Sequence, residues 1–288
     1  MGSNIATGAN IFVTDLDGTL LRNNTTVSPP ATQTLTHLLQ QQAPISIATA
    51  RSIVSVRQIL GHIPFQLPIV CANGAYVTNL ADNQREFIQD IPQSLAEDLL
   101  ELGIEWGFSP LISTYSYAAQ RELLYVQDVN NHPLRTYIED RQQTKDERLT
   151  FTPSIRSCLK DAVLNLNLMA ERPRVIELMG EIKRRYPGLI QCYTYEGFAG
   201  DQYVWLSVYA QGATKGLALK RWLEGHGHDP AQLVVFGDQL NDCSMFEVAG
   251  KAVAVADAHP GLKVLADEVI GSNEEDAVVA YIANWLQD

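Results

Sequence analysis

The stretch Asp15-Leu16-Asp17-Gly18-Thr19-Leu20 follows a short apolar run, Ile11-Phe12-Val13, and it decides the fold of this chain. A buried strand sends alternate side chains to the same face, so Asp15 and Asp17 can converge where the strand breaks into the Gly-Thr turn. In an open α/β sheet, ligands bind at that carboxyl end. Paired carboxylates there suit two tasks, which are to hold a hard cation such as Mg²⁺ and to attack a phosphoryl group. The alternative is an Asp-rich turn without such a role.

Other predicted strands and one helix also carry polar, chemically useful residues at their ends. Thr49 ends an apolar run that begins at Ile45, and Arg51 follows it closely. Lys215 stands at the start of a helical pattern. The predicted strand 233–236 runs directly into a polar segment that contains Gly237, Asp238, Asn241 and Asp242. Several buried strands that end in such residues indicate an active-site edge of a sheet.

Short apolar strands alternate with helical patterns at both ends of the chain, over residues 11–77 and again from Lys215 onward. Helices between such strands predict an α/β core, with a doubly wound, Rossmann-like parallel sheet and right-handed crossovers. Between these two parts strands and helices do not alternate strictly, so we expect an inserted α+β cap domain. The expected boundaries are 1–83 and 212–288 for the core and 84–211 for the cap.

Within the expected cap, helices are predicted over residues 92–102 and 173–186. Strands are predicted over 111–115, 123–126, 162–169, 189–195 and 203–208. The stretch 128–150 is dense in Asn, Gln, Arg and Asp, and it is predicted as a polar region. In the second part of the core, the pattern after Asn241 predicts a helix over 242–249.

The charge balance excludes some classes of partner. The chain has 288 residues, with 21 Lys and Arg against 33 Asp and Glu, for a net charge of −12. This balance repels nucleic acid and anionic membranes, so neither is an expected partner.

No apolar run approaches the ~20 residues that a membrane span needs, and the first ten residues lack the pattern of a secretory signal. Four dispersed cysteines fit a reducing compartment, and we expect a cytoplasmic protein.

Taken together, the motifs resemble those of the haloacid dehalogenase-like phosphatases, and within them the Cof-type sugar-phosphate phosphatases. Asp15 through Thr19 matches the first family motif, Thr49 the second and Lys215 the third. The segment from Gly237-Asp238 to Asn241-Asp242 matches the fourth, with a long insertion between the second and the third. Asn73-Gly74-Ala75 is similar to a family element that helps to shape the pocket. The resemblance covers nearly the whole chain.

The resemblance implies a mechanism with an aspartyl-phosphate intermediate. Asp15 would be the nucleophile, and Asp17 would protonate the leaving oxygen and then deprotonate the attacking water. Mg²⁺ would be held by Asp15, the Asp17 backbone carbonyl and Asp238, with Asp242 acting directly or through water. Thr49 and Lys215 would hold the phosphoryl oxygens. The predicted substrate pocket is completed by residues near these positions, namely Gly18, Ala50, Arg51, Asn73, Gly74 and Asn241.

Simpler roles remain open for several of these residues. Lys215 could be an exposed lysine at a helix start, and Thr49 could cap the helix that follows. Arg51 could pair with an acidic neighbour, and Asp242 could be the N-cap of the 242–249 helix. Ala50 stands where the family usually has Gly, which puts the substrate fit in doubt but leaves the core chemistry untouched.

The resemblance suggests small phosphorylated metabolites as substrates, and a sugar phosphate above all. Two other functions stay open. One is a phosphosugar mutase that uses the same Asp chemistry, and the other is a non-catalytic, metabolite-binding regulatory protein. The sequence identifies neither the particular substrate, nor the cap residues that select it, nor the oligomeric state.

Overall fold

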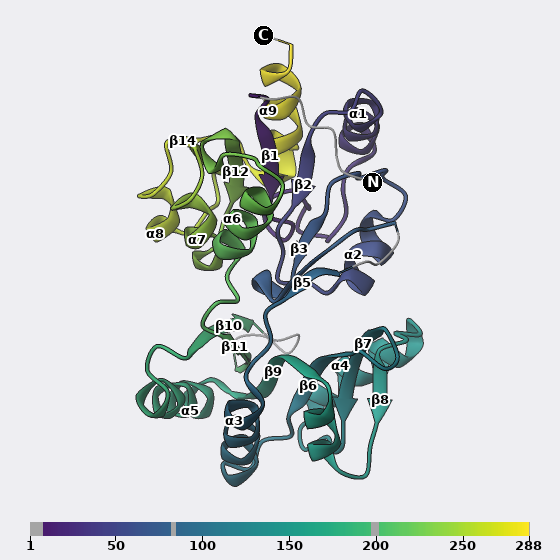
Figure 1. Ribbon diagram of the computed structural model, residues 1–288, viewed down its shortest axis with the longest axis vertical. Helices are drawn as coiled ribbons and strands as arrows, with labels where there is room; N and C mark the ends of the chain where they lie inside the picture. Colours follow the sequence, from purple (N-terminus) through teal and green to yellow (C-terminus); the bar gives the residue numbers. More distant parts are fainter. Residues whose placement is uncertain (1–7, 82–84, 197–201, 288) are drawn as a thin grey trace. The chain divides into compact units, whose positions relative to one another are not determined.

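The computed structural model describes residues 8–81, 85–196 and 202–287, which form two compact units (Figure 1). The first unit comprises the described residues up to Ile88 together with those from Thr214 onward. The second comprises the described part of Gln89–Ala213. The predicted cap boundary at residue 84 lies outside the described residues, and the assignment of the two units to core and cap stays a prediction.

The main sheet of the first unit is parallel, with the strand order β14-β13-β12-β1-β2. Its strands are β1 (Ile11–Thr14), β2 (Ile45–Ile47), β12 (Leu233–Gly237), β13 (Lys251–Ala254) and β14 (Glu268–Val269). β1 lies between β12 and β2, so that Val13 pairs with Val235 on one side and Ser46 on the other. All residues of β1 and β12 are buried, as expected at the centre of a parallel sheet. The predicted doubly wound core is confirmed.

Helices connect and flank these strands. They are α1 (Pro29–Gln40), α2 (Ile53–Leu60), α6 (Lys215–Gly225), α7 (Cys243–Phe246), α8 (Pro260–Lys263) and α9 (Ala277–Trp285). Ser28, Ser52 and Thr214 are the N-caps of α1, α2 and α6, and each accepts a backbone N–H of the first turn. α1 packs against α9, and α6 packs against α7.

A small antiparallel sheet extends the first unit next to β2. It consists of β3 (Ile69–Cys71), β4 (Tyr76–Thr78) and β5 (Arg85–Ile88). A bridge between Ala48 and Val70 joins it to the end of β2. The tight turn Ala72–Gly74 connects β3 to β4, and all three of its residues are buried.

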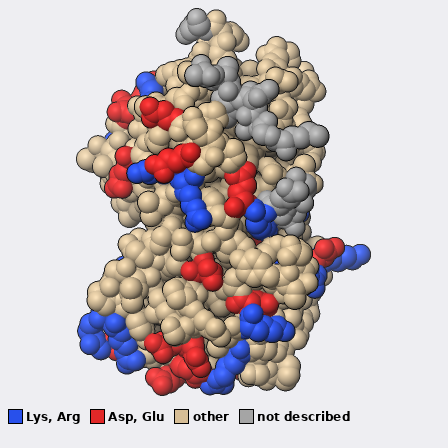
Figure 2. Space-filling view, in the orientation of Figure 1, with Lys and Arg blue, Asp and Glu red and all other residues tan. Residues whose placement is uncertain are grey.

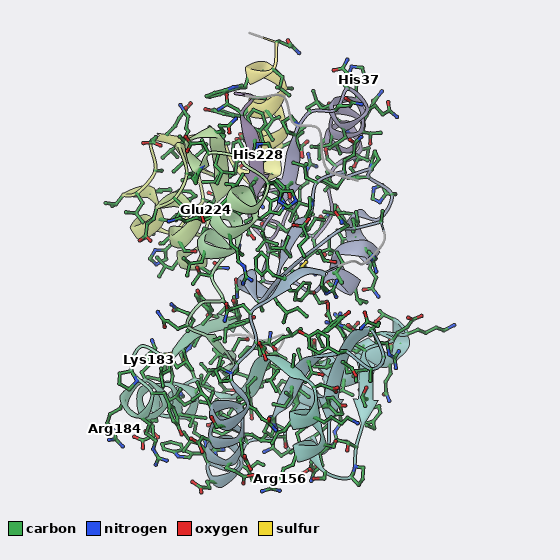
Figure 3. All side chains as sticks on the ribbon, in the orientation of Figure 1. His37, Arg156, Lys183, Arg184, Glu224 and His228 are labelled. Atoms are coloured by element: carbon green, nitrogen blue, oxygen red, sulfur yellow. The ribbon has the colours of Figure 1, made fainter. Side chains whose placement is uncertain are left out.

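The second unit is built on a mixed, mostly antiparallel sheet with the order β10-β11-β9-β6-β7-β8. Its strands are β6 (Leu111–Ser116), β7 (Arg121–Val126), β8 (Leu149–Phe151), β9 (Ala162–Glu171), β10 (Ile190–Glu196) and β11 (Tyr203–Ala210). Its helices are α3 (Gln93–Glu105), α4 (His132–Gln143) and α5 (Arg172–Arg185). In α5, the last turn carries Lys183, Arg184 and Arg185, and the first two are labelled in Figure 3. Positive charge at this end is favoured by the helix dipole.

The polar region predicted over 128–150 contains a helix, α4, and the start of β8. The helix begins because the Asn131 side chain accepts the N–H of Leu134 and Pro133 occupies the first turn. Leu134 and Ile138 of α4 pack in a cluster with Met169 of β9. A few well-placed residues, Pro133, Leu134 and Ile138, are thus enough to bury one face of an otherwise polar helix.

The charges on the surface and the length of the helices are relevant to nucleic acid and membranes as partners. Figure 2 shows acidic and basic side chains interspersed over one face of the molecule, without a broad basic stripe in that view. Within the described ranges, no helix has the length and apolar character to cross a membrane.

Candidate active site

The two carboxylates around the turn after β1 differ in their burial and in their partners. The Asp15 amide donates to the carbonyl of Phe236 at 2.9 Å, so Asp15 continues the strand pairing, and the residue is buried. The Leu21 amide donates to the Leu16 carbonyl at 2.8 Å and closes the turn. The Asp17 side chain remains 47% exposed. Asp17 is not one of the three carboxylates that form the buried cluster described below, and the expected convergence of Asp15 and Asp17 stays a prediction.

Gly18 and Thr19 bring the first turn against the loop after β12. Gly18 has a φ of +77°, and a methyl group on its Cα would overlap the carboxylate of Asp238. The Thr19 hydroxyl donates to Asp238 Oδ1 at 2.8 Å. The sequence prediction did not assign Thr19 a role. Its position in the same hexapeptide as Asp15 could have indicated that it belongs to the site. Thr19 positions the Asp238 carboxylate.

Three predicted metal ligands form a buried cluster at the carboxyl ends of β1 and β12. Carboxylate oxygens of Asp15, Asp238 and Asp242 all lie within 4.8 Å of one another. The Lys215 ammonium donates to Asp15 Oδ1 at 2.5 Å and to Asp242 Oδ1 at 2.6 Å. Lys215 is fully buried, so the alternative of an exposed lysine at a helix start is wrong. Segments 200 residues apart in the chain thus meet at one site.

The cluster holds more negative than positive charge. Three carboxylates against one ammonium leave a net charge of −2 when all are ionised. Burial raises the pKa of Asp15 well above its usual value, and burial followed by the neighbouring Asp242 raises the pKa of Asp238 to about 6. Burial alone would lower the pKa of Lys215, but Asp15 and Asp242 outweigh it and raise that pKa. The lysine is therefore a cation, and the carboxylates are under-compensated.

This donor set fits a hard divalent cation. The ligands are oxygen atoms, they are buried, and their excess charge is what an added dication would neutralise. Asp15 and Asp238 are the residues that would hold it. Asp242 already uses both oxygens, because its Oδ1 accepts from Lys215 and its Oδ2 accepts the amides of Asp238 and Gln239, each at 3.0 Å. Its Oδ1 accepts this one bond and keeps a lone pair, so Asp242 could hold the cation directly or through water.

The helix expected over 242–249 is shorter than predicted. A 3₁₀ turn covers Leu240–Asp242 and the α-helix extends only over Cys243–Phe246. The Asp242 side chain makes no capping bond to that helix, because it accepts the amides at the start of the 3₁₀ turn. The loop geometry thus directs Asp242 toward Lys215.

Asp17 and Arg51 form an ion pair, and neither residue is one of the three carboxylates of the buried cluster. Arg51 Nε donates to Asp17 Oδ2 at 2.7 Å, and Nη2 donates to Asp17 Oδ1 at 2.6 Å. The third guanidinium nitrogen, Nη1, donates to the Ser55 hydroxyl at 3.0 Å. Such a two-point fork is a strong, directional ion pair. The simpler role considered for Arg51, pairing with an acidic neighbour, is the one the structure shows.

The remaining predicted residues lie around the ends of β2 and β3. Thr49 is fully buried, and its hydroxyl accepts the amide of Arg51 at 3.1 Å. The N-cap of α2 is Ser52, so the alternative capping role for Thr49 is wrong. The Asn241 amide donates to Asn73 Oδ1 at 3.0 Å, which links the loop after β12 to the turn after β3. Ala50 is partly buried beside them, and Gly74 is buried.

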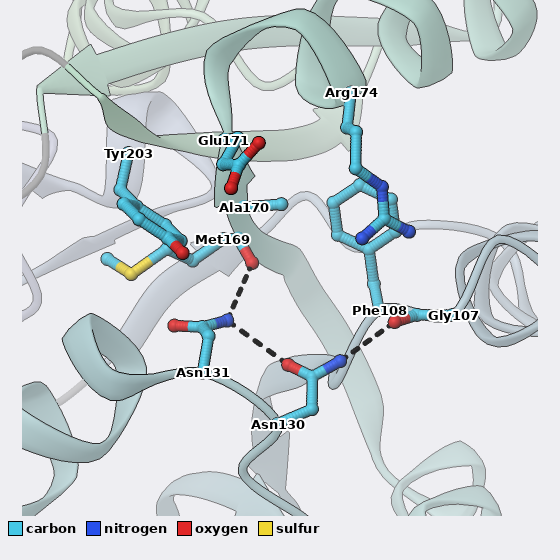
Figure 4. Close-up of a pocket in the computed structure, with 9 residues that line it drawn as sticks. All are labelled: Gly107, Phe108, Asn130, Asn131, Met169, Ala170, Glu171, Arg174 and Tyr203. Atoms are coloured by element: carbon cyan, nitrogen blue, oxygen red, sulfur yellow. Dashed lines mark hydrogen bonds between the residues drawn. The ribbon is translucent and has the colours of Figure 1, made fainter.

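A polar cavity of about 270 Å³ lies within the second unit (Figure 4). It is lined by Gly107, Phe108, Asn130, Asn131, Met169, Ala170, Glu171, Arg174 and Tyr203. Asn130 donates to the Gly107 carbonyl at 2.8 Å and Asn131 to the Met169 carbonyl at 3.1 Å, so two amides tie its walls together. None of the predicted site residues lines this cavity. Its lining comes from several separate loops and strand ends, and no sequence motif indicated that they lie together.

Comparison with known proteins shows similarity to one family over nearly the whole chain. Residues 12–282 match the model of a haloacid dehalogenase-like hydrolase family. The pyridoxal phosphate phosphatase of Escherichia coli (strain K12) is 27% identical, over 96% of this chain and 98% of that protein. The 5-amino-6-(5-phospho-D-ribitylamino)uracil phosphatase of Bacillus subtilis (strain 168) is 22% identical, over 96% and 97%. The crystal structure of a haloacid dehalogenase-like hydrolase from Bacteroides thetaiotaomicron superposes with a TM-score of 0.76 at 24% identity, covering 96% of this chain and 99% of that one.

Proposed function

The chain belongs to the haloacid dehalogenase-like hydrolase family and is a phosphoric monoester hydrolase, and on this premise we propose that it is a Mg²⁺-dependent phosphatase of small metabolites. The proposed reaction proceeds through an aspartyl-phosphate on Asp15. The observation that carries the proposal is the buried cluster of Asp15, Asp238 and Asp242 around the Lys215 ammonium. A buried nucleophile beside a buried cation and an excess of carboxylate oxygens is a costly arrangement that stability alone does not require.

In the first step the Asp15 carboxylate attacks the phosphorus atom, and the bond from phosphorus to the leaving oxygen breaks. One Asp15 oxygen is held by Lys215, which fixes the carboxylate and leaves its other oxygen for the attack. When bound, Mg²⁺ offsets the repulsion between the carboxylate and the phosphoryl dianion. Lys215 and the buried Thr49 would stabilise charge on the phosphoryl oxygens as the transition state forms.

Proton transfer is assigned to Asp17. It would give a proton to the leaving oxygen and, in the second step, take one from the water that attacks the phosphorus of the aspartyl-phosphate. The products are inorganic phosphate and the free Asp15 carboxylate. Such acid–base help is worth about 10²–10⁴ in rate. Asp17 is half exposed and bound by Arg51. Its carboxyl would have to release Arg51 before it could donate to the leaving oxygen.

The proposed substrates are small phosphorylated metabolites. The family resemblance favours a sugar phosphate. The named relatives from E. coli and B. subtilis act on pyridoxal phosphate and on a phosphoribitylamino-uracil, and both names describe a phosphorylated compound that contains a nitrogen heterocycle. A test should therefore include phosphorylated cofactors and cofactor precursors beside hexose phosphates. We propose a cytoplasmic enzyme whose partners are such metabolites, with no nucleic acid or membrane among them.

The experiment is phosphate release from a panel of sugar, sugar-alcohol and cofactor phosphates, with Mg²⁺ or with a chelator. Mg²⁺-dependent release from at least one compound supports the proposed function, and the ranking of kcat/KM names the substrate class. Retained phosphate with interconverted sugar isomers would favour the mutase. Binding of a phosphorylated compound without turnover would favour the regulatory protein.

Metal binding should also stabilise the protein in a pH-dependent way. In the metal-free protein the pKa of Asp238 is about 6, above its value of about 3.9 in an unfolded chain. The folded state therefore holds this proton more tightly than the unfolded state. As a result, stability is lost as the pH rises from about 4 to about 6, by on the order of 3 kcal/mol for this group. Asp15, whose pKa is also raised, changes the stability in the same direction.

Because Mg²⁺ requires the ionised carboxylate, its stabilising effect should grow over the same pH range. At a Mg²⁺ concentration of about 100 times its Kd, this stabilisation amounts to about 2.7 kcal/mol. At a pH one unit below the pKa of Asp238, a proton competes with the metal and removes about 1.4 kcal/mol of it. The measurement is thermal unfolding with Mg²⁺ and with chelator at pH 5 and pH 7.5. The Mg²⁺ increment should be larger at pH 7.5, and Asp238→Asn should largely abolish it. An equal increment at both pH values would contradict a metal site at Asp238.

A further inference from the structure

The turn between β3 and β4 has an unusual backbone. Three consecutive residues lie in the left-handed region, with φ values of +48° for Ala72, +54° for Asn73 and +95° for Gly74. Side chains on L-residues disfavour this region, although Asn tolerates it better than most. Two such non-glycine residues in succession persist only where surrounding contacts hold them, and strain of this kind is concentrated at functional sites.

The contacts that hold the turn come from two of the segments assigned to catalysis. The Asn73 amide donates to the Thr49 carbonyl at 3.0 Å, and the Ala72 amide donates to the Arg51 carbonyl at 2.9 Å. Gly74 packs so closely on Thr214 that a methyl group on its Cα would overlap the Thr214 carbonyl. Thr214 is the residue before Lys215. The backbone of the turn therefore fixes the segment after β2 and abuts the start of α6.

The side chain of Asn73 reaches a third segment. It is fully buried, and its Oδ1 accepts one N–H of the Asn241 amide at 3.0 Å. Asn241 is partly buried and directly precedes Asp242 of the acidic cluster. A primary amide has two N–H groups, so this bond sets the plane of the Asn241 amide and leaves its second N–H as a donor.

We propose that Asn73 is a positioning residue for the reaction proposed above, on which this inference rests. Asn73 does not contact the phosphoryl group in this scheme. It orients Asn241, and the second N–H of Asn241 then donates to a phosphoryl oxygen. Asn suits position 73 because it combines tolerance of the left-handed region with a short side chain that ends in an acceptor. From the sequence, Asn73 is expected in the phosphate pocket, and in this proposal it has an indirect role there.

The test is a double-mutant cycle that uses Asn73→Gly and Asn241→Ala. Glycine tolerates the left-handed backbone, so the turn should stay folded, although the substitution removes the whole buried side chain together with its acceptor. kcat and KM for p-nitrophenyl phosphate and the inhibition constant of inorganic phosphate are measured with Mg²⁺ for the wild type, both single variants and the double variant. Each single variant should lower kcat/KM about tenfold and weaken phosphate inhibition, as expected for one lost hydrogen bond to a charged group. The double variant should be no worse than Asn241→Ala alone.

Two further measurements separate this inference from its premise. Gln42→Gly is a matched control, because Gln42 is an exposed residue with a φ of +64° outside the site, and its kinetics should equal those of the wild type. Proton exchange of the Asn241 side-chain amide, followed by NMR, should accelerate at least fivefold in Asn73→Gly. If the single effects multiply in the double variant, or if the exchange is unchanged, Asn73 does not act through Asn241. If the wild type releases no phosphate at all, the proposed function fails first, and the role of Asn73 in it fails with it.

Discussion

Replacing Asp15 with Asn is expected to abolish phosphate release and to leave the protein folded. Asn has nearly the same shape but is not a nucleophile, so kcat should fall by on the order of 10³ or more. The metal-free protein, in contrast, should become more stable to unfolding. Burial raises the pKa of Asp15, which means that its charge is disfavoured in the folded state, and a neutral side chain removes that cost. The measurements are phosphate release with Mg²⁺ and thermal unfolding with chelator.

Asp257→Asn is the matched control for this substitution. Asp257 is exposed and lies outside the cluster, so the same chemical change there should affect neither rate nor stability. An Asp15→Asn variant that is folded and retains more than a tenth of the wild-type rate would contradict the role of Asp15 as nucleophile. An unfolded variant would instead contradict our account of the charge balance in the cluster.

Replacing Lys215 with Met should damage both activity and stability. Lys215 supplies the only positive charge among the described residues that contact Asp15 and Asp242 directly. Without it, buried carboxylates remain uncompensated, and loss of one partner of a buried ion pair costs about 3–5 kcal/mol. The rate should fall by about 10²–10³, because the charge that would stabilise the phosphoryl oxygens is gone. Mg²⁺ should restore part of the stability, and little of the rate.

Lys251→Met provides the control for the loss of a lysine. Lys251 pairs with Glu268 at 2.9 Å, but its side chain is 32% exposed, and such surface pairs contribute about 0–1 kcal/mol. Its loss should leave phosphate release unchanged. Equal effects of the two substitutions, measured by denaturant unfolding with and without Mg²⁺ and by kcat, would contradict a special role for Lys215.

The core of the fold could be predicted because its strands are buried on both faces. Buried parallel strands such as β1 and β12 are short, continuous apolar runs, and their ends are marked by polar residues. The helix α4 has no comparable signal. Only a few of its residues are buried, among them Leu134 and Ile138, and the packing partner Met169 lies far away in sequence. Tertiary packing, which the local pattern does not contain, decides this helix.

The acidic cluster could be predicted from motif order, but its internal arrangement could not. A lysine at a helix start is usually exposed, and Lys215 is buried because the start of α6 packs tightly against α7. Gly216 permits this, since a methyl group there would overlap the Ser244 carbonyl. The two-residue spacing of Asp15 and Asp17 suggested convergence. In the structure the Asp17 carboxylate pairs with Arg51, a partner that the spacing did not reveal.

The measurement that tests the central claim most directly is the trapping of the aspartyl-phosphate in the variant Asp17→Asn. p-Nitrophenolate leaves without protonation, so this variant should still form the intermediate but should hydrolyse it slowly. We predict a rapid burst of about one p-nitrophenolate per enzyme in the presence of Mg²⁺. Borohydride reduction after a quench should convert residue 15 to homoserine, as detected by mass spectrometry. A burst that leaves residue 15 unmodified, or homoserine at another position, would contradict the account.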